Sequence, residues 1–156
     1  MVKSITEKCS AKINIAIDVL GKYPNGYHEV RMIMTQVGIF DVITISLKDE
    51  KGIEIAGSDI NMPVDESNLA WKAANEFFKA IKFDGGCDIY IEKHIPMGAG
   101  MAGGSSDAAG VINGLNKLFD SPLSLEERMK MGKKLGADVP FCVCLLYTSP
   151  SPRDMR

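Results

Sequence analysis

The sequence predicts an α+β domain in which a mainly antiparallel sheet packs against helices on one side. Several short stretches alternate apolar and polar residues, which is typical of half-buried strands. Other stretches place apolar residues at helical spacing. A glycine-rich segment joins a predicted strand to a predicted helix. With 156 residues, the chain is long enough for one such domain with its own core.

The first predicted strand covers residues 11–20. One of its faces carries the apolar residues Ile13, Ile15, Ile17 and Val19, so we expect a half-buried strand. Lys12 and Asn14 point the same way from the opposite face, because side chains alternate along a strand. The strand alone does not decide whether these two residues only face solvent or belong to a site.

Three more strands are predicted before the first helix, at about residues 30–37, 41–47 and 52–56. Pro24-Asn25-Gly26 marks the turn that precedes them. The segment between the second and third of these strands is short and charged. We therefore expect these two strands to form a hairpin in a mainly antiparallel sheet.

Helices are predicted at residues 69–81, at 105–119 and from Ser124 to Gly136. Asn68 is a suitable N-cap for the first helix. A capping box opens the third, and a glycine ends it. A strand is predicted at residues 87–93, before the glycine-rich segment, and another after Pro140.

The glycine-rich segment has four glycines within seven residues, from Gly98 to Gly104. Glycine adopts positive φ readily and has no Cβ to keep a ligand away. A helix that begins at such a loop directs its unpaired N–H groups and its positive dipole end toward the loop. The pattern therefore predicts an anion site, most simply for phosphate. The alternative is a tight glycine turn that binds nothing.

Two known phosphate motifs fit this segment incompletely. Gly98-x-Gly100-x-x-Gly103 satisfies the dinucleotide fingerprint, but the predicted helix is followed by another helix, so the second parallel strand is missing. The spacing also resembles a P-loop, except that Gly104 stands where the lysine belongs. A phosphate site here must therefore take its cation from elsewhere in the chain.

Composition and charge set limits on the class of protein. The hydrophobic content is 46% and the charged content 24%, which is ordinary for a globular protein. A formal net charge of −2 gives no reason to expect nucleic acid or a membrane surface as a partner. The sequence contains no apolar run long enough for a membrane span and no signal-peptide pattern at its start. We expect a cytoplasmic protein with reduced cysteines.

The last residues, 144–156, do not continue the pattern of the domain. They start as an apolar stretch and then change to Ser-Pro repeats with mixed charge. Proline cannot continue the interior of a strand. We therefore expect a domain over residues 1–143 and a disordered tail that does not look native.

Three blocks in order resemble the GHMP kinases: Ala11-Lys12-Ile13-Asn14, the loop at residues 96–109, and Gly136-Ala137-Asp138-Val139-Pro140. Gly26-Tyr27-His28 is similar to the block of the members that act on a cytidylyl substrate in the non-mevalonate isoprenoid pathway. The resemblance implies a GHMP kinase N-terminal, ATP-binding domain over residues 1–143, without the family's C-terminal domain. Ala99 and Ala102 stand where members often have glycine, and we expect φ below zero at both.

The resemblance also implies roles in phosphoryl transfer from ATP to the substrate's C2 hydroxyl. Asp138 would be the general base and Lys12 the cation that assists it. Ser105 or Ser106 would contact Mg²⁺ through Mg-ATP. Asp107 is expected to stabilise the helix start rather than bind metal. The residues implied to bind ATP are Pro96, Met97, Gly98, Ala99, Gly100, Met101, Ala102, Gly103, Gly104, Ser105 and Ser106.

The small-molecule cytidylyl substrate would be bound by Asn14, Tyr27 and His28, which offer a π-face and hydrogen-bonding groups. Three alternatives stay open. The chain could be an inactive N-terminal fragment, because one wall of the family's cleft would be absent. It could be another GHMP small-molecule kinase. More distantly, it could be a dinucleotide-binding oxidoreductase.

Overall fold

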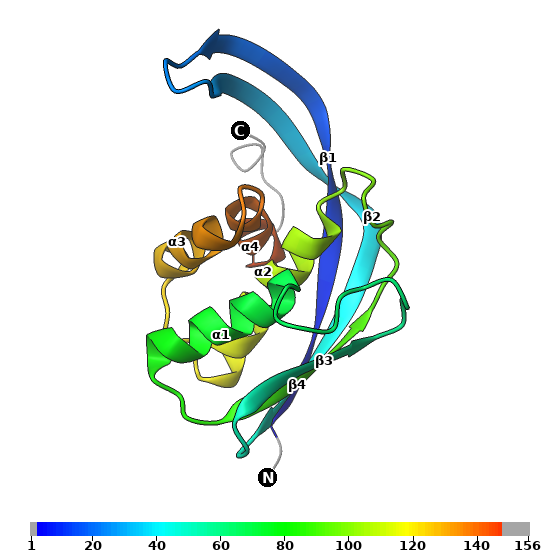
Figure 1. The fold of residues 1–156 in the computed structure, drawn as a ribbon, viewed down its shortest axis with the longest axis vertical. Helices are drawn as coiled ribbons and strands as arrows, with labels where there is room; N and C mark the ends of the chain where they lie inside the picture. Colours follow the sequence, from blue (N-terminus) through cyan, green and yellow to red (C-terminus); the bar gives the residue numbers. More distant parts are fainter. Residues whose placement is uncertain (1–2, 148–156) are drawn as a thin grey trace.

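The computed structural model describes residues 3–147 and forms one α+β unit (Figure 1). Residues 148–156 of the predicted tail lie outside the described residues. Within residues 3–147, no helix is long and apolar enough to cross a membrane. In chain order the elements are β1 (Ser4–Lys22), β2 (His28–Lys48), β3 (Gly52–Gly57), α1 (Leu69–Ile81), β4 (Gly86–Glu92), α2 (Gly103–Leu118), α3 (Leu125–Leu135) and α4 (Val139–Tyr147).

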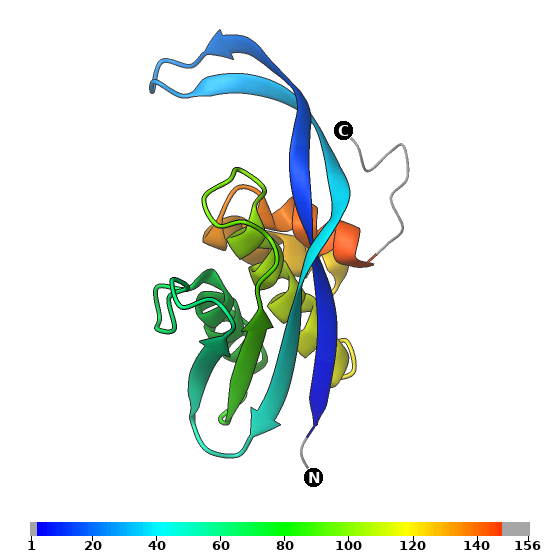
Figure 2. The same cartoon turned by 90° about the vertical axis from the view of Figure 1, so that its right-hand side faces the viewer.

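The four strands form one sheet in the order β1-β2-β4-β3. The β1–β2 and β2–β4 pairs are antiparallel, and the β3–β4 pair is parallel. The helices lie together on one face of the sheet, as expected (Figures 1 and 2). The expected hairpin between residues 41–47 and 52–56 is wrong, because β4 lies between these two strands.

The place of β4 follows from its composition. Its alternate residues Cys87, Ile89 and Ile91 are at most 1% exposed, so this strand loses most from standing at an edge. The shorter β3 is left at the edge of the sheet. Gly86 allows the parallel pairing to begin, because a Cβ there would overlap the carbonyl oxygen of Gly52.

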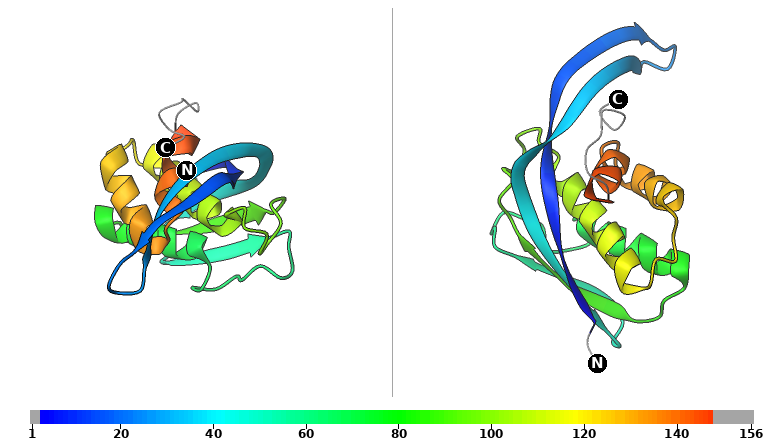
Figure 3. Two further views of the ribbon diagram at one scale, coloured as in Figure 1. Left: turned by 90° about the horizontal axis from the view of Figure 1, so that it is seen from above. Right: turned by 180° about the vertical axis from the view of Figure 1, so that it is seen from behind.

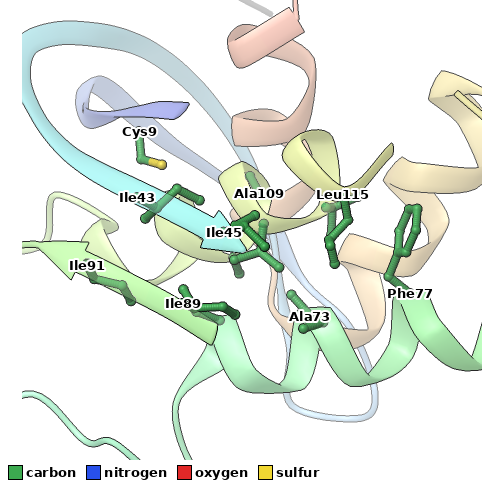
Figure 4. Close-up of a cluster of buried hydrophobic side chains, with 14 of the residues drawn as sticks. Cys9, Ile43, Ile45, Ala73, Phe77, Ile89, Ile91, Ala109 and Leu115 are labelled. Carbon is green, nitrogen blue, oxygen red and sulfur yellow. The ribbon is translucent and has the colours of Figure 1, made fainter. Parts of the chain in front are cut away.

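The core lies between the sheet and helices α1 and α2 (Figure 4). Ile43 and Ile45 of β2 face Ala109 and Leu115 of α2, and Phe77 of α1 closes the far end of the cluster. Small residues bring α2 close to the sheet. A Cβ on its Gly110 would lie 2.9 Å from Cδ1 of Ile43 and would overlap the Cys9 thiol. Gly110 thus allows the middle of α2 to lie close against the sheet, and the Ser106 hydroxyl, which donates to the Ser10 carbonyl, joins the first turn of α2 to β1.

Strands β1 and β2 continue past the helices as a curved two-stranded ribbon (Figures 2 and 3). The expectation that residues 11–20 form a half-buried strand is wrong for most of this segment. Ile15 and Ile17 are 57% and 56% exposed, because no described helix covers this part of the ribbon. The predicted strands 30–37 and 41–47 are a single strand, β2, and register shifts interrupt its pairing with β1.

The segment after Pro140 forms helix α4 rather than the expected strand. Proline is tolerated in the first turn of a helix, where its missing N–H would have no partner. The N–H of Cys142 donates to the Asp138 carbonyl, which is the first helical hydrogen bond. Cys142 and Val143 are buried, and the Asn113 side chain of α2 donates to the Val143 carbonyl. The burial of this apolar segment against α2 therefore accounts for the helix.

Candidate functional site

The glycine loop, residues 96–102, borders a cleft of about 390 Å³ at the start of α2. Gly98 and Gly100 have φ of 72° and 73°, which explains two of the glycines. Ala102 also has positive φ, 56°, so the expectation of negative φ at this residue is wrong. Residue 102 is the N-cap of α2 and turns the chain into the helix. An alanine therefore holds a conformation that suits glycine better.

The N-terminus of α2 faces this cleft. Its N-cap residue provides no side-chain hydrogen bond, so the first N–H groups of the helix have no capping partner from this residue. The two serines of the first turns differ in position. Ser106 is buried and donates to the Ser10 carbonyl at 2.7 Å, whereas Ser105 lines the cleft. Ser106 is therefore bound to β1, and Ser105 is the serine that borders the cleft.

Lys12, Asn14 and Asp138 come together on the other side of the glycine loop. The Lys12 ammonium lies 3.6 Å from Asp138 Oδ2 and donates to Asn14 Oδ1 at 3.3 Å. The Lys12 side chain is 6% exposed and that of Asp138 is 35% exposed. The backbone N–H of Lys12 donates to the Met101 carbonyl, which ties β1 to the loop. The arrangement places a buried cation beside an accessible carboxylate.

Tyr27 and His28 lie at the far end of the ribbon, and the structure does not bring them to Lys12. His28 pairs with Lys22, eight residues beyond Asn14 on β1. At about 3.3 Å per residue this corresponds to about 26 Å along the strand. The Tyr27 side chain is among the most exposed apolar groups, at 74%.

A buried charge cluster beside the cleft was not predicted. The Lys93 ammonium donates to Asp41 Oδ2 at 2.6 Å and to Asp107 Oδ2 at 2.9 Å. Asp41 Oδ1 accepts the backbone N–H groups of His94 and Ile95. Asp107 thus pairs with Lys93 instead of only stabilising the helix start. A signal was available: Asp41 lies on the same strand face as the buried Ile43, so its carboxylate needs a partner.

The two carboxyls of this cluster have pKa values displaced in opposite directions. Burial, together with the hydrogen bond to Asp41, raises the pKa of Asp107 to about 8. Burial also acts to raise the pKa of Asp41, but its hydrogen bond with Asp107, together with those from Ile95 and Lys93, outweighs burial and lowers this pKa. Asp107 Oδ1 is buried without a hydrogen-bond partner. A single lysine between two carboxyls therefore favours a proton on one of them.

No group of three or more His, Cys, Asp or Glu side chains within residues 3–147 is arranged to hold a metal ion. Mg²⁺ that arrives with a nucleotide needs only one or two protein oxygens, because phosphates and water supply the remainder. Ser105, a residue with one hydroxyl that borders the cleft, fits that limited requirement.

The glycine loop, β4 and helices α1 to α3 lie in a part of the chain that matches a family of kinases. The family described as "GHMP kinases N terminal domain" matches residues 68–144. The chain belongs to the GHMP kinase family.

Relatives of known name agree with this assignment. A 4-diphosphocytidyl-2-C-methyl-D-erythritol kinase of Lachnoclostridium phytofermentans is 49% identical over 139 residues, which is 89% of this chain and 48% of the relative. The kinase of the same name from Clostridioides difficile is 47% identical over 136 residues, or 87% of this chain and 46% of the relative. The chain thus spans about half the length of the curated relatives it matches.

Solved structures show the same fold. A crystal structure of 4-(cytidine 5'-diphospho)-2C-methyl-D-erythritol kinase superposes with a TM-score of 0.78 and 33% identity, over 90% of this chain and 49% of that one. A homoserine kinase from Cytophaga hutchinsonii has a TM-score of 0.66 at 15% identity, over 97% of this chain and 44% of that one, which shows the fold alone.

Proposed function

We propose that this chain is the ATP-binding half of a kinase that phosphorylates the C2 hydroxyl of 4-diphosphocytidyl-2-C-methyl-D-erythritol. The observation that carries the proposal is the Lys12–Asp138 pair, which the Lys12 N–H links to the glycine loop at Met101. A phosphate site and a lysine–carboxylate pair thus meet at one loop. The names of the relatives at 49% and 47% identity support the choice of substrate.

ATP lies with its phosphates at the glycine loop in this proposal. The N–H groups at the start of α2 donate to phosphate oxygens, and the helix dipole favours their negative charge. Positive φ at Gly98 and Gly100 leaves loop backbone exposed to the ligand. Mg²⁺ bound with ATP would neutralise phosphate charge, and we assign Ser105, which lines the cleft, as the residue that would contact it.

Asp138 and Lys12 serve the transfer step. The substrate hydroxyl gives its proton to the Asp138 carboxylate as its oxygen bonds to the γ-phosphorus, and the bond from that phosphorus to ADP breaks. The Lys12 ammonium, 3.6 Å from the carboxylate, stabilises the negative charge that develops on the attacking oxygen. Because the Lys12 side chain is 6% exposed, little water screens this interaction.

Substrate recognition begins at Asn14, whose side chain already contacts Lys12. Its amide offers a donor and an acceptor to a ligand next to the pair. The part of Tyr27 and His28 in binding the cytidylyl group stays a prediction. Because Asn14 and His28 lie far apart along the ribbon, one small molecule can contact both only if the ribbon curves toward the glycine loop.

The order of elements after the loop argues against a dinucleotide-binding oxidoreductase. Helix α2 is followed by α3 and α4, so the described residues contain no βαβ unit after the glycine loop. Competition between ATP and NAD for the purified chain checks this point. Exclusive binding of NAD would remove the kinase proposal.

The activity test uses a chimera that joins residues 1–143 to the C-terminal half of the Clostridioides difficile relative. It is given ATP with 4-diphosphocytidyl-2-C-methyl-D-erythritol, homoserine or mevalonate, and ADP release is measured. We expect turnover with the first acceptor only, and ³¹P NMR should place the new phosphate on the C2 oxygen. Equal turnover with another acceptor would indicate a different GHMP kinase. The unextended chain, tested alongside, shows whether this half alone is inactive.

A further inference from the structure

The glycine loop contains no lysine, yet one cation lies at its cleft. Among the side chains of residues 3–147 that line the cleft, Lys93 is the only cationic one. The other charged side chain there is Asp107. Lys12 does not line this cleft, because its ammonium is turned toward Asp138 and Asn14.

The Lys93 ammonium lies directly beneath the start of α2. A Cβ built on Gly103 would lie 3.2 Å from Lys93 Nζ and 3.1 Å from Cγ2 of Ile95. A side chain on Gly103 would therefore require Ile95 and the Lys93 ammonium to shift, since both lie next to the space that its Cβ would occupy. This places the positive charge beside the N–H groups at the beginning of the helix, where an anion would be held.

The ammonium is held in one position rather than reaching freely from the surface. Its side chain is 6% exposed, and hydrogen bonds of 2.6 and 2.9 Å join it to Asp41 and Asp107. Two backbone N–H groups fix the Asp41 carboxylate in turn. A cation that is already ordered loses little side-chain entropy when a ligand binds.

The cluster is not complete in its hydrogen bonding. An ammonium has three N–H donors, and oxygens of the Asp41 and Asp107 carboxyl groups accept two of them. Asp107 Oδ1 is buried without a partner, although buried polar atoms are normally satisfied. Both observations are expected if a ligand with its bound water completes the hydrogen bonds at this wall of the cleft.

We propose that Lys93 supplies the positive charge of the phosphate site, in place of the lysine that the loop lacks. The inference rests on the proposed function, because it takes the glycine loop as the nucleotide site. It separates the roles of two lysines: Lys93 binds the phosphates of the nucleotide, and Lys12 acts on the transferred group. Asp41 and Asp107 are positioning residues that hold Lys93 under the loop.

The experiment compares ADP with adenosine, because only ADP carries phosphates. Dissociation constants are measured by calorimetry for the 156-residue chain and for Lys93→Met, without divalent cations that could replace the ammonium. We expect Lys93→Met to weaken the binding of ADP at least about tenfold, which is the loss typical of a charged hydrogen bond. The binding of adenosine should weaken less than twofold. Lys72→Met, on the exposed face of α1, makes the same change in net charge and should leave both constants unchanged.

A second pair of variants tests whether a loss of affinity reflects misfolding. This control is needed because Lys93→Met leaves buried acidic groups without their cation, which destabilises a fold. Asp107→Asn is compared with the double variant Lys93→Met/Asp107→Asn, in which Asp41 keeps its two backbone donors. The double variant should again lose ADP affinity selectively. Equal losses for ADP and adenosine, or no loss of ADP affinity, would overturn the inference.

The outcomes for the unmodified chain separate the two proposals. If the chain binds adenosine and ADP with equal affinity, the role proposed for Lys93 is wrong, but the cleft is still a nucleoside site. If it binds neither molecule, the glycine loop is not a nucleotide site, and the proposed function fails together with the inference.

Discussion

The Lys12 ammonium lies 3.6 Å from Asp138 Oδ2, across the base of the glycine loop. These residues are 126 positions apart in sequence, and they meet because β1 contacts the loop while α4 begins directly after Asp138. The carboxylate is 35% exposed and therefore accessible to solvent, whereas the lysine beside it is nearly buried.

This pair predicts a loss of catalysis when either member is removed. In the chimera with the Clostridioides difficile half, Asp138→Asn removes the proton acceptor and Lys12→Met removes the cation. Each should lower kcat by about two orders of magnitude or more, since general-base catalysis contributes about 10²–10⁴-fold. Steady-state kinetics measure this, with Asp18→Asn on the exposed ribbon as the matched control. Near-normal turnover in a pair variant would remove that residue from the mechanism.

Ala102 predicts a stabilising substitution. Its φ of 56° costs an alanine about 1–2 kcal/mol. Glycine removes this strain but adds about 0.4–1 kcal/mol of unfolded-state entropy. Ala102→Gly should therefore raise the free energy of unfolding by about 0.5–1 kcal/mol, as measured by urea denaturation.

Ala99 provides the matched comparison within the same loop. It is not among the residues with positive φ. Ala99→Gly should therefore lower the free energy of unfolding by about 0.4–1 kcal/mol, because only the entropy cost applies. Changes of the same sign in the two variants would contradict the assignment of strain to Ala102.

The raised pKa of Asp107 predicts how stability depends on pH. The folded protein keeps a proton on this carboxyl up to a pKa of about 8, whereas an unfolded Asp releases it near its ordinary pKa of 3.8. Between these values the folded state binds more protons, so the free energy of unfolding falls as pH rises. The slope from this one group is at most about 1.4 kcal/mol per pH unit. The lowered pKa of Asp41 acts in the opposite sense, and only below 3.8.

Asp107→Asn should flatten this dependence. Urea denaturation at pH 5.5, 7.0 and 8.5 measures the slope, and Asp49→Asn on an exposed connection controls for the loss of one carboxyl. The wild-type and Asp49→Asn proteins should lose stability over this range more steeply than Asp107→Asn. Identical slopes in all three proteins would show that Asp107 is already ionised in the folded state.

The exposed ribbon predicts self-association. Ile15 and Ile17 are more than half exposed on a two-stranded segment, a combination that favours association between chains. Ile15→Thr/Ile17→Thr keeps β propensity and removes apolar surface. Light scattering should show less association at equal concentration, with the thermal midpoint little changed. Ile60→Thr, at a single residue that is 97% exposed outside the ribbon, should change neither quantity.

Local signals in the sequence were enough for the helices that begin at caps. Asn68 accepts from Ala70 N–H, and the reciprocal Ser124–Glu127 bonds of the capping box are both present. These interactions join residues two or three positions apart, so the sequence contains all the information they need. The expected fold class, an α+β domain with helices on one side of the sheet, is also confirmed.

The sequence also named Lys12, Asn14, Asp138 and the glycine loop as the candidate site. The structure brings these residues together, and their roles stay predictions. The sequence could not reveal the position of Lys93. That position depends on the hydrogen bond to Asp41, which lies 52 positions earlier, and on the packing of α2 against β2. The sign of φ at Ala102 was missed because alanine gives no local signal for it.

The sequence by itself therefore determined the capped helices, the glycine loop and the family of this protein, because these depend on short-range hydrogen bonds, apolar periodicity and contiguous motifs. Tertiary structure alone decided that β4 separates β2 from β3, that the segment after Pro140 is helical, and that the ribbon is exposed. The physical reason is that all the strands and helices bury their apolar side chains against one another at the same time. The place of each segment depends on which neighbours compete to cover it.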